Sequence, residues 1–324
     1  MRIAIPEPSL PIISVAEHKS VHSLAKALYD SCTAEGFIYV CDHGIPQEVI
    51  DKAFAISAGY FDGELEDKVH LSVDIKNNTG YTAIRQESSG DLKELFHFAD
   101  GHWRTVNGVK QQNLPAALEA ARADLDTFVE YTNALAARLL EGLAVALKLQ
   151  SDFFTSQHTG ELNRMRMLHY PPVPNDHKDL DPTQADIRAG AHTDYGSITI
   201  LFQHLVSGLQ VRRNGSWVDI APMKGCVVIN IGDALEFWSG GLFRSTLHRV
   251  VMPRSQAELA SRYSIAYFVH PDNNSVLDAV MDGSNGVLLD RFIVSKGLPP
   301  GTRRISGGDY VQHRLNATYD AVKK

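Results

Sequence analysis

The pattern of apolar residues changes near Asn163, and this change limits the folds that the chain of 324 residues can adopt. Before Asn163, apolar residues recur at helical spacing over residues 15–35, 46–60 and 115–148. A short apolar run in that half, Phe37–Val40, predicts a buried strand. After Asn163, short apolar segments alternate with turn residues, as in antiparallel sheets. The pattern therefore predicts a helical region followed by a β-sandwich or jelly-roll barrel.

The second half supplies enough strand-like segments to build such a core. Asn214-Gly215 predicts a hairpin turn between two of them, and Gly308–Val322 returns to a helical pattern. We expect one domain over 1–324, with a mostly helical region (1–162), a jelly-roll core (163–270) and a C-terminal region (271–324). The predicted strands are Arg166–Tyr170, Ser197–Gln203, Gly208–Arg212, Trp217–Ile220, Cys226–Ile231, Leu247–Val251 and Tyr263–Val269.

Composition and charge narrow the class of partner. The chain is 44% hydrophobic and 21% charged, as is ordinary for globular proteins, and it is long enough to bury a core without a disulfide or structural metal. The net charge of −7 is mild, and no run of Lys or Arg predicts a nucleic-acid or membrane surface. No stretch approaches the ~18 apolar residues of a membrane span. We expect a monomer that acts on a small molecule.

The cysteines predict a reducing environment. Cys32, Cys41 and Cys226 are too few and too scattered for a disulfide framework, and no CxxC pair suggests a thiolate metal site. The first fifteen residues hold one Arg and three prolines and do not resemble a signal peptide. We therefore expect a cytoplasmic protein with free thiols.

Two metal-binding side chains stand two residues apart in His192-Thr193-Asp194. On a strand, residues at this spacing face the same side, so both side chains can reach one ion. His248, in the strand-like segment Ser245–Val250, is the best candidate for a third ligand. Two imidazoles and one carboxylate on one face of an ion leave other positions open, as in non-haem Fe(II) oxygenases. The same ligands around zinc would suit hydrolysis.

Arg262 and Ser264 repeat the two-residue spacing on a later predicted strand. The planar guanidinium of Arg262 matches a carboxylate through two parallel hydrogen bonds, and Ser264 adds a hydroxyl donor beside it. A dicarboxylate that chelates iron at one end needs such a clamp at its other end. The pair therefore favours iron over zinc at the His-Asp-His site.

Ordered motifs extend over nearly the whole chain. They are Glu35–Val40, His43–Pro46, Gly80-Tyr81, Asp91–Glu94, Met165–Pro172, Ala191–Thr199, Gly208–Val211, Asn230–Asp233, His248–Val250 and Arg262–Ser264. In this order they resemble the isopenicillin N synthase-like branch of the 2-oxoglutarate/Fe(II) oxygenases. The resemblance implies a mainly β core, a double-stranded β-helix (jelly-roll), within a frame of N-terminal helices and a C-terminal helix.

The resemblance also assigns the cofactor. It implies that His192, Asp194 and His248 bind Fe(II), and that 2-oxoglutarate and O₂ are cosubstrates. The expected reaction converts 2-oxoglutarate to succinate and CO₂ while a small polar molecule is hydroxylated, desaturated or cyclised. Relatives of this kind act on amino acids and in secondary metabolite biosynthesis.

Near the cosubstrate, the resemblance implies that Arg262 and Ser264 hold the distal carboxylate of 2-oxoglutarate, with help from Tyr170. Plant members often carry Asn-Tyr-Tyr-Pro at the strand of Tyr170, where this chain has Leu168-His169-Tyr170-Pro171. Leu168 is apolar and cannot replace the asparagine contact.

For the substrate, the motifs around Arg188–Thr199 and Arg262–Phe268 are most similar to fungal thymine hydroxylase-type enzymes. That similarity implies a pocket lined by Asn163, Arg166, Tyr195 and Phe268. Arg85, in the N-terminal segment that relatives fold over the mouth of the site, is a further candidate. Such a pocket suits a small, flat or carboxylated polar molecule.

Other polar residues predict structural roles. His169 should face away from the iron, because it lies on the opposite face of its strand from the neighbouring tyrosine. We interpret His43 as part of the framework, Asn230 and Asp233 as residues of a turn, and Trp217 as packing.

Two other functions remain open from the sequence. One is an oxidase with the same iron ligands that does not consume 2-oxoglutarate, which release of succinate would distinguish. The other is a non-enzymatic ligand-binding protein on the same fold, which a test for metal-dependent turnover would distinguish.

Overall fold

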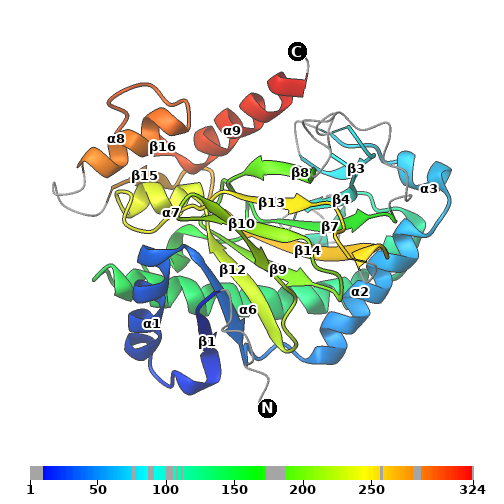
Figure 1. The fold of residues 1–324 in the computed structure, drawn as a ribbon, viewed down its shortest axis with the longest axis horizontal. Coiled ribbons are helices and arrows are strands. Elements are labelled where there is room, and N and C mark those ends of the chain that lie inside the picture. Colours follow the sequence, from blue (N-terminus) through cyan, green and yellow to red (C-terminus); the bar gives the residue numbers. More distant parts are fainter. Residues whose placement is uncertain are drawn as a thin grey trace.

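The computed structural model describes residues 10–74, 78–86, 91–99, 105–106, 109–110, 112–172, 187–255, 258–279 and 286–322. In this part of the chain, an eight-stranded and a four-stranded sheet form the β-core, and helices surround it (Figure 1). Short strand pairs outside the core join β5 to β6 and β15 to β16. Their bounds are Thr105–Val106 (β5), Val109–Lys110 (β6), Val276–Asp278 (β15) and Arg304–Ser306 (β16).

The large sheet has the strand order β1-β2-β12-β9-β14-β7-β4-β3. Its central strands are rich in Val, Ile, Leu and aromatic residues that are almost fully buried, as strands covered on both faces require. The strands are Ile12–Ser14 (β1), Phe37–Cys41 (β2), Gly80–Thr82 (β3), Glu94–Ala99 (β4), Arg164–Tyr170 (β7), Ile198–Gln203 (β9), Cys226–Ile231 (β12) and Arg262–Val269 (β14).

The small sheet has the order β11-β10-β13-β8. Its strands are Ile187–His192 (β8), Leu209–Arg213 (β10), Ser216–Ile220 (β11) and His248–Val251 (β13). Asn214 and Gly215 join β10 to β11 with φ values of 47° and 82°, so the predicted hairpin turn is confirmed. β13 pairs with β8 in a register that sets His248 opposite His192.

Two helices, α1 (Val21–Ala34) and α6 (Arg122–Ala146), pack against each other beside the large sheet (Figure 1). Their close approach depends on Gly142, because a Cβ there would lie 2.7 Å from Leu28 Cδ1 and 3.2 Å from Leu24 Cγ. A larger residue at this position would push the helices apart.

The remaining helices frame both ends of the core. Figure 1 shows α8 and α9 on the opposite side of the molecule from the N-terminal end, with α9 near β8 and α8 next to α7. The bounds are Val15–Glu17 (η1), Gln47–Phe61 (α2), Leu65–Val69 (α3), Ala116–Ala120 (α5), Thr155–Gln157 (η2), Asp233–Trp238 (α7), Gly286–Ser295 (α8) and Gly307–Val322 (α9). Within the described ranges, no helix combines the length and apolar character needed to span a bilayer.

The predicted jelly-roll core with a helical frame is confirmed. The N-terminal region also contributes strands that its helical pattern does not predict, since β3 and β4 form one edge of the large sheet. β4 is buried along its whole length against β7, and this burial includes its polar residues Glu94 and His97.

The expectation that the cysteines stay unpaired is wrong, because Cys41 and Cys226 form a disulfide. They are 185 residues apart in the chain, but β2 and β12 are antiparallel neighbours, and their register places these two residues opposite each other. Spacing along the sequence cannot reveal such a pairing. Cys32 is free and buried in α1.

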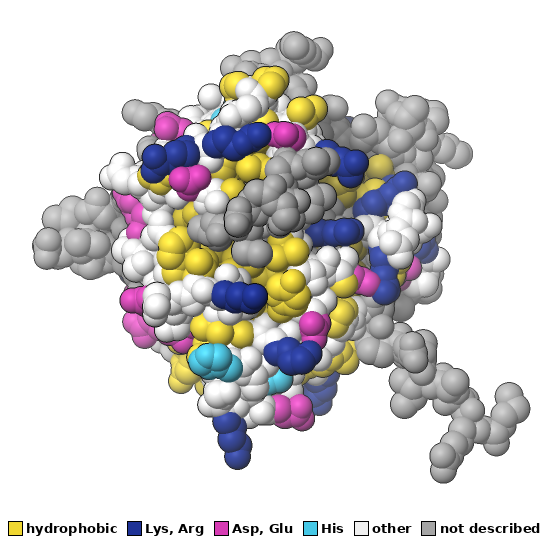
Figure 2. Space-filling view, turned by 90° about the vertical axis from the view of Figure 1, so that its left-hand side faces the viewer, with side chains coloured by type: hydrophobic (Ala, Val, Ile, Leu, Met, Phe, Trp, Pro, Cys, Tyr) yellow, Lys and Arg dark blue, Asp and Glu magenta, His cyan; other side chains and the backbone are white. Residues whose placement is uncertain are grey.

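Charged side chains of both signs are mixed on the face seen in Figure 2, with apolar side chains between them. Basic residues do not gather there into one continuous surface, in line with the mild net charge of −7.

Candidate metal centre

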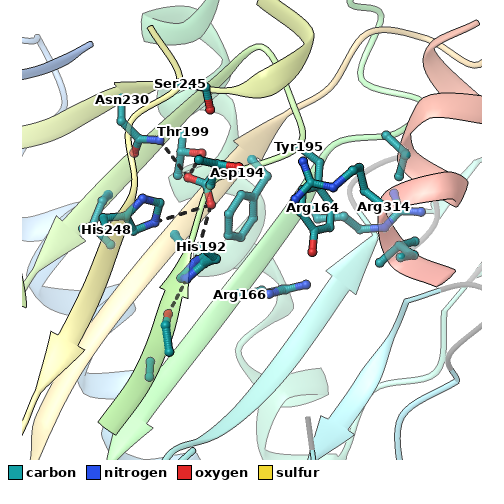
Figure 3. A pocket seen from close by; sticks show the side chains of 18 of the residues that line it. Arg164, Arg166, His192, Asp194, Tyr195, Thr199, Asn230, Ser245, His248 and Arg314 are labelled. Carbon is teal, nitrogen blue, oxygen red and sulfur yellow. Dashed lines mark hydrogen bonds and ion pairs between the residues drawn. The ribbon is translucent and has the colours of Figure 1, made fainter. Parts of the chain in front are cut away.

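The neighbouring strands β8 and β13 bring three metal-binding side chains together. His192 ends β8, Asp194 follows two residues later, and His248 begins β13 (Figure 3). The Asp194 Oδ1 atom lies 3.9 Å from His192 Nε2 and 3.6 Å from His248 Nε2. One ligand atom from each residue lies within 4.8 Å of the others. The predicted ligands therefore converge on a single point.

Backbone carbonyls orient both imidazoles. His192 Nδ1 lies 2.8 Å from the Gly190 carbonyl, and His248 Nδ1 lies 3.1 Å from the Thr246 carbonyl. A carbonyl can only accept, so Nδ1 carries the proton and Nε2 presents a lone pair to the ion. The His192 side chain is 48% exposed towards the cavity, but desolvation by the protein atoms around it and the neighbouring His248 lower its pKa to about 4, so the ring is neutral and able to bind metal.

Neutral donors hold the carboxylate of Asp194. Its Oδ2 accepts hydrogen bonds from Thr199 Oγ1 at 2.7 Å and from Asn230 Nδ2 at 2.8 Å, so Oδ1 faces the histidines. Burial alone would raise the pKa of Asp194, but the two histidines and these hydrogen bonds lower it below its usual value. The interpretation of Asn230 as only a turn residue is incomplete, because its amide orients a metal ligand.

A cavity of about 1340 Å³ opens beside the three ligands. The residues predicted to bind 2-oxoglutarate, Arg262, Ser264 and Tyr170, all line it. The Arg262 Cζ atom lies 4.9 Å from the centre of the Tyr170 ring, and Arg262 Nη1 lies 3.4 Å from Ser264 Oγ. Arg262 is only 2% exposed, and its Nε has no hydrogen-bond partner.

Among the residues predicted for the substrate, Arg166, Tyr195 and Phe268 line the cavity. The Arg166 guanidinium stacks on the Phe268 ring with its Cζ 5.1 Å from the ring centre. Asn163 is not among the lining residues, and its amide bonds to Tyr267 and to the backbone N–H of His270. Arg85 is exposed at φ 64° and also lies outside the lining.

Two further arginines line the same side of the cavity and were not predicted from the sequence. Arg164 lies on β7, and Arg314 comes from α9 with its Cζ 4.5 Å from the centre of the Tyr195 ring. Figure 3 shows Arg164, Arg314 and Tyr195 gathered to one side of the metal ligands, with Arg166 below them in this view. Arg164 lies two residues before Arg166 on β7, so the period of a strand could have indicated that both side chains face the cavity.

Asp233 connects the C-terminal helices to the metal loop. Its carboxylate is fully buried and pairs with Lys296, which directly follows α8, at 2.6 Å and with Arg314 of α9. It also accepts hydrogen bonds from Ser245 at 2.7 Å and from Thr193, which lies between His192 and Asp194, at 3.2 Å. The interpretation of Asp233 as a turn residue therefore missed an ionic anchor.

Two further residues of the sequence motifs, His169 and Lys93, pair with acidic residues next to the cavity. His169 faces away from the metal ligands, as predicted, because its Nδ1 contacts Glu94 at 2.8 Å and its ring stacks on Tyr263. Lys93 lines the cavity and pairs with Asp91. Trp217 packs under the guanidinium groups of two arginines of the small sheet, as expected for a structural residue.

The donor set fits Fe(II). Two imidazole nitrogens and one carboxylate oxygen on one face leave positions for a chelating cosubstrate and O₂, and no thiolate that would favour a closed zinc site is among the three ligands. A jelly-roll core with this triad and a buried arginine deep in the cavity defines the class of non-haem Fe(II) oxygenases.

The chain belongs to the 2OG-Fe(II) oxygenase superfamily, which residues 162–271 match. Residues 10–114 match the N-terminal region described as non-haem dioxygenase in morphine synthesis. The chain is therefore a 2-oxoglutarate-dependent dioxygenase that uses Fe(II) and oxidises a small molecule.

Relatives agree in fold and length. The structure of the full-length thymine hydroxylase of Neurospora crassa with alpha-KG and 5-formyluracil is 30% identical, with a TM-score of 0.81, and the match covers 95% of this chain and 96% of that one. A 2-oxoglutarate-Fe(II) type oxidoreductase of Emericella nidulans is 30% identical over 81% of this chain and 80% of its own. The 1-aminocyclopropane-1-carboxylate oxidase of Dictyostelium discoideum is 28% identical over 82% of this chain and 83% of its own.

Proposed function

We propose that Arg262, Ser264 and Tyr170 bind the distal carboxylate of 2-oxoglutarate, while His192, Asp194 and His248 bind the iron that its 2-oxo acid end chelates. The observation that carries this assignment is the burial of Arg262. Its side chain is almost fully buried, and no carboxylate of the described residues forms an ion pair with it. A buried cation is costly without an anion, and the distal carboxylate supplies one.

In this assignment the protein positions the reactants and excludes water. The iron supplies the O₂ chemistry when it is bound. Arg262 would fix one end of 2-oxoglutarate. The carbonyl contacts of His192 and His248 orient these two ligands of the iron, which the other end of 2-oxoglutarate would chelate. Asp194 supplies the single negative charge among the three ligands.

The substrate occupies the side of the cavity lined by Arg166, Tyr195 and Phe268. The stacked Arg166 and Phe268 side chains offer a flat wall with donors at its edge, and Arg164 and Arg314 add positive charge nearby. The positive charge and the planar stacked wall favour a small, flat or carboxylated polar molecule.

Two of the predicted substrate residues receive other roles. The amide of Asn163 is occupied by Tyr267 and by the His270 backbone, so we assign it the support of the cavity wall rather than direct contact. Arg85 stays a candidate for the outer mouth only. One relative binds thymine and another is a 1-aminocyclopropane-1-carboxylate oxidase, and these small polar molecules support the same class of substrate here.

The test is a panel of pyrimidines, amino acids and small carboxylic acids incubated with the protein, Fe(II), ascorbate and 2-oxoglutarate. We expect one class to stimulate succinate formation in step with an oxidised product. Product formed without succinate would instead identify an oxidase on the same fold, and no turnover with any member would favour a binding protein.

Arg262→Lys tests the clamp. It keeps the charge but loses the paired donors, so the KM for 2-oxoglutarate should rise about tenfold, equivalent to ~1.4 kcal/mol. Arg262→Ala should raise it further. A KM that ignores both substitutions would contradict the assignment.

The cellular context belongs to the same proposal. We propose a monomer with a role in secondary metabolite biosynthesis. We place it in the cytoplasm, because Fe(II) chemistry needs a reducing supply of metal. The Cys41–Cys226 disulfide argues for a less reducing site. Titration of free thiols in protein from the native source, cell fractionation and sedimentation would each decide one of these points.

A further inference from the structure

A second buried guanidinium lies beside Tyr170, on the far side of the cavity lining. Arg188 of β8 is 2% exposed, and its Cζ atom lies 5.2 Å from the centre of the Tyr170 ring. Arg262 approaches the same ring to 4.9 Å. Tyr170 therefore has two buried cations around it, of which only Arg262 lines the cavity.

Neither cation is neutralised within the described part of the chain. Arg188 Nη2 donates to the carbonyl of Pro171, and its Nε has no partner. No carboxylate in the described ranges forms an ion pair with Arg188 or Arg262. Burial, and to a lesser extent the proximity of Arg262, lower the pKa of Arg188 to about 10, so it still carries its charge at neutral pH.

The positive charges of Arg188 and Arg262 repel each other in a poorly solvated region and destabilise the empty site. An anion bound near both would relieve this repulsion. A contact with one carbonyl oxygen explains where Arg188 points, but a carbonyl does not compensate a full positive charge. The nearest place for an anion is the pocket in front of Arg262, at the Tyr170 ring that both arginines contact.

We propose that Arg188 is a positioning residue for the cosubstrate: its charge acts across Tyr170 on the distal carboxylate and makes the site selective for 2-oxo dicarboxylates over 2-oxo monocarboxylates. This rests on the proposed cosubstrate role of Arg262. Arg188 does not touch the ligand, so its contribution is electrostatic and depends on the negative charge at the far end of the ligand.

The test compares two ligands of the same chain length that differ only in the distal carboxylate. Calorimetry would give the Kd of 2-oxoglutarate and of 2-oxopentanoate, which lacks the distal carboxylate, for protein loaded with Fe(II) under anaerobic conditions. Arg188→Gln removes the charge but retains a donor for the Pro171 carbonyl. We expect the Kd of 2-oxoglutarate to rise about tenfold, with the Kd of 2-oxopentanoate changed less than about twofold.

Rescue and control variants separate charge from structure. Arg188→Lys restores a cation and should return most of the affinity for 2-oxoglutarate. Arg212→Gln removes an arginine stacked on Trp217 outside the cavity lining, at a Cζ-to-ring distance of 5.3 Å, and should change neither Kd. Arg188→Met is the second neutral variant, to be used if the glutamine prevents folding.

Equal weakening of both ligands would overturn the proposal, because it would show that Arg188 only braces the strand. No change for either ligand would overturn it as well. If Arg262→Lys also leaves the Kd of 2-oxoglutarate unchanged, the proposed clamp itself is wrong. If Arg262→Lys weakens binding and Arg188→Gln does not, the clamp stands and only the role of Arg188 fails.

Discussion

The metal side of the cavity and the side that we propose for the substrate are held in place by different kinds of contact. On the metal side, two ligands lie on adjacent strands and Asp194 lies in the loop after β8, and neutral hydroxyl, amide and carbonyl groups hold all three. On the substrate side, Arg164 and Arg166 come from β7 and Arg314 from α9, and the charge of Arg314 is held by the buried Asp233. The metal ligands are therefore held by neutral hydrogen-bonding groups. The arginines opposite come from elements far apart in the chain, and an ion pair holds Arg314.

This difference separates the two tasks of the site. Thr199 and Asn230 orient Asp194 without adding charge. The negative charge next to the ion therefore comes from the Asp194 carboxylate. Cations on the opposite side attract an anionic or strongly polar molecule without competing for the metal. A change of substrate can then occur in β7 or α9 while the metal ligands remain as they are.

The largest effect should follow loss of a metal ligand. His192→Ala, Asp194→Ala and His248→Ala should each abolish turnover and metal binding, while the β-core stays folded because its burial does not depend on one ion. Succinate formation, metal calorimetry and thermal unfolding would be measured on each variant. Near-normal activity in any one of them would remove that residue from the site.

The sequence predicts the metal side well for a physical reason. The two-residue spacing of His192 and Asp194 predicts a common direction on a strand, and their motif resembles a known family. In the structure β8 ends at His192, and Asp194 reaches the same point from the loop that follows. His248 lies further along the chain, but it begins a recognisable strand. The two support residues of Asp194 are missed, because nothing in the spacing of Thr199 and Asn230 indicates that β9 and β12 place them together.

The substrate side is predicted only in part. Arg166, Tyr195 and Phe268 follow from the resemblance, but Arg314 lies in a helix whose docking depends on the ion pairs of Asp233. Pairings between residues this far apart, like the Cys41–Cys226 disulfide, depend on sheet order and helix packing, which one sequence does not specify.

Asp233→Asn tests whether ionic anchoring is specific to the substrate side. It leaves Lys296 and Arg314 buried without their counter-charge, so the free energy of unfolding should fall by about 3–5 kcal/mol. Chemical unfolding would measure this loss, and metal calorimetry should show affinity changed by less than about threefold. Asp309→Asn, at an exposed helix start in the same region, is the matched control and should cost below about 1 kcal/mol. A large loss of metal affinity in Asp233→Asn would mean that the two sides are not separable.

Asn230→Leu makes the corresponding change on the metal side. It keeps the branching of the side chain but removes one of the two donors to Asp194 Oδ2, so metal affinity should fall about 10- to 100-fold with little change in the arginines opposite. Thr199→Val should act in the same direction through the other donor. Asn214→Gly, in the exposed β10–β11 turn, controls for the loss of an asparagine. Unaltered metal affinity in Asn230→Leu would show that Asp194 is held by its backbone alone.

Arg166→Ala should have the smallest effect, and it decides what the substrate side does. If Arg166 contacts the substrate, the Kd of the molecule found in the metabolite panel should rise about tenfold, since a charged hydrogen bond is lost. The Kd of 2-oxoglutarate should stay within about twofold, and a larger share of 2-oxoglutarate should decay without product. If Arg166 instead braces β7, which carries Tyr170, cosubstrate binding should weaken first. Arg212→Ala, another arginine stacked on an aromatic ring but outside the cavity lining, should change neither constant. A loss of affinity confined to 2-oxoglutarate would therefore assign Arg166 to cosubstrate binding and contradict its proposed contact with the substrate.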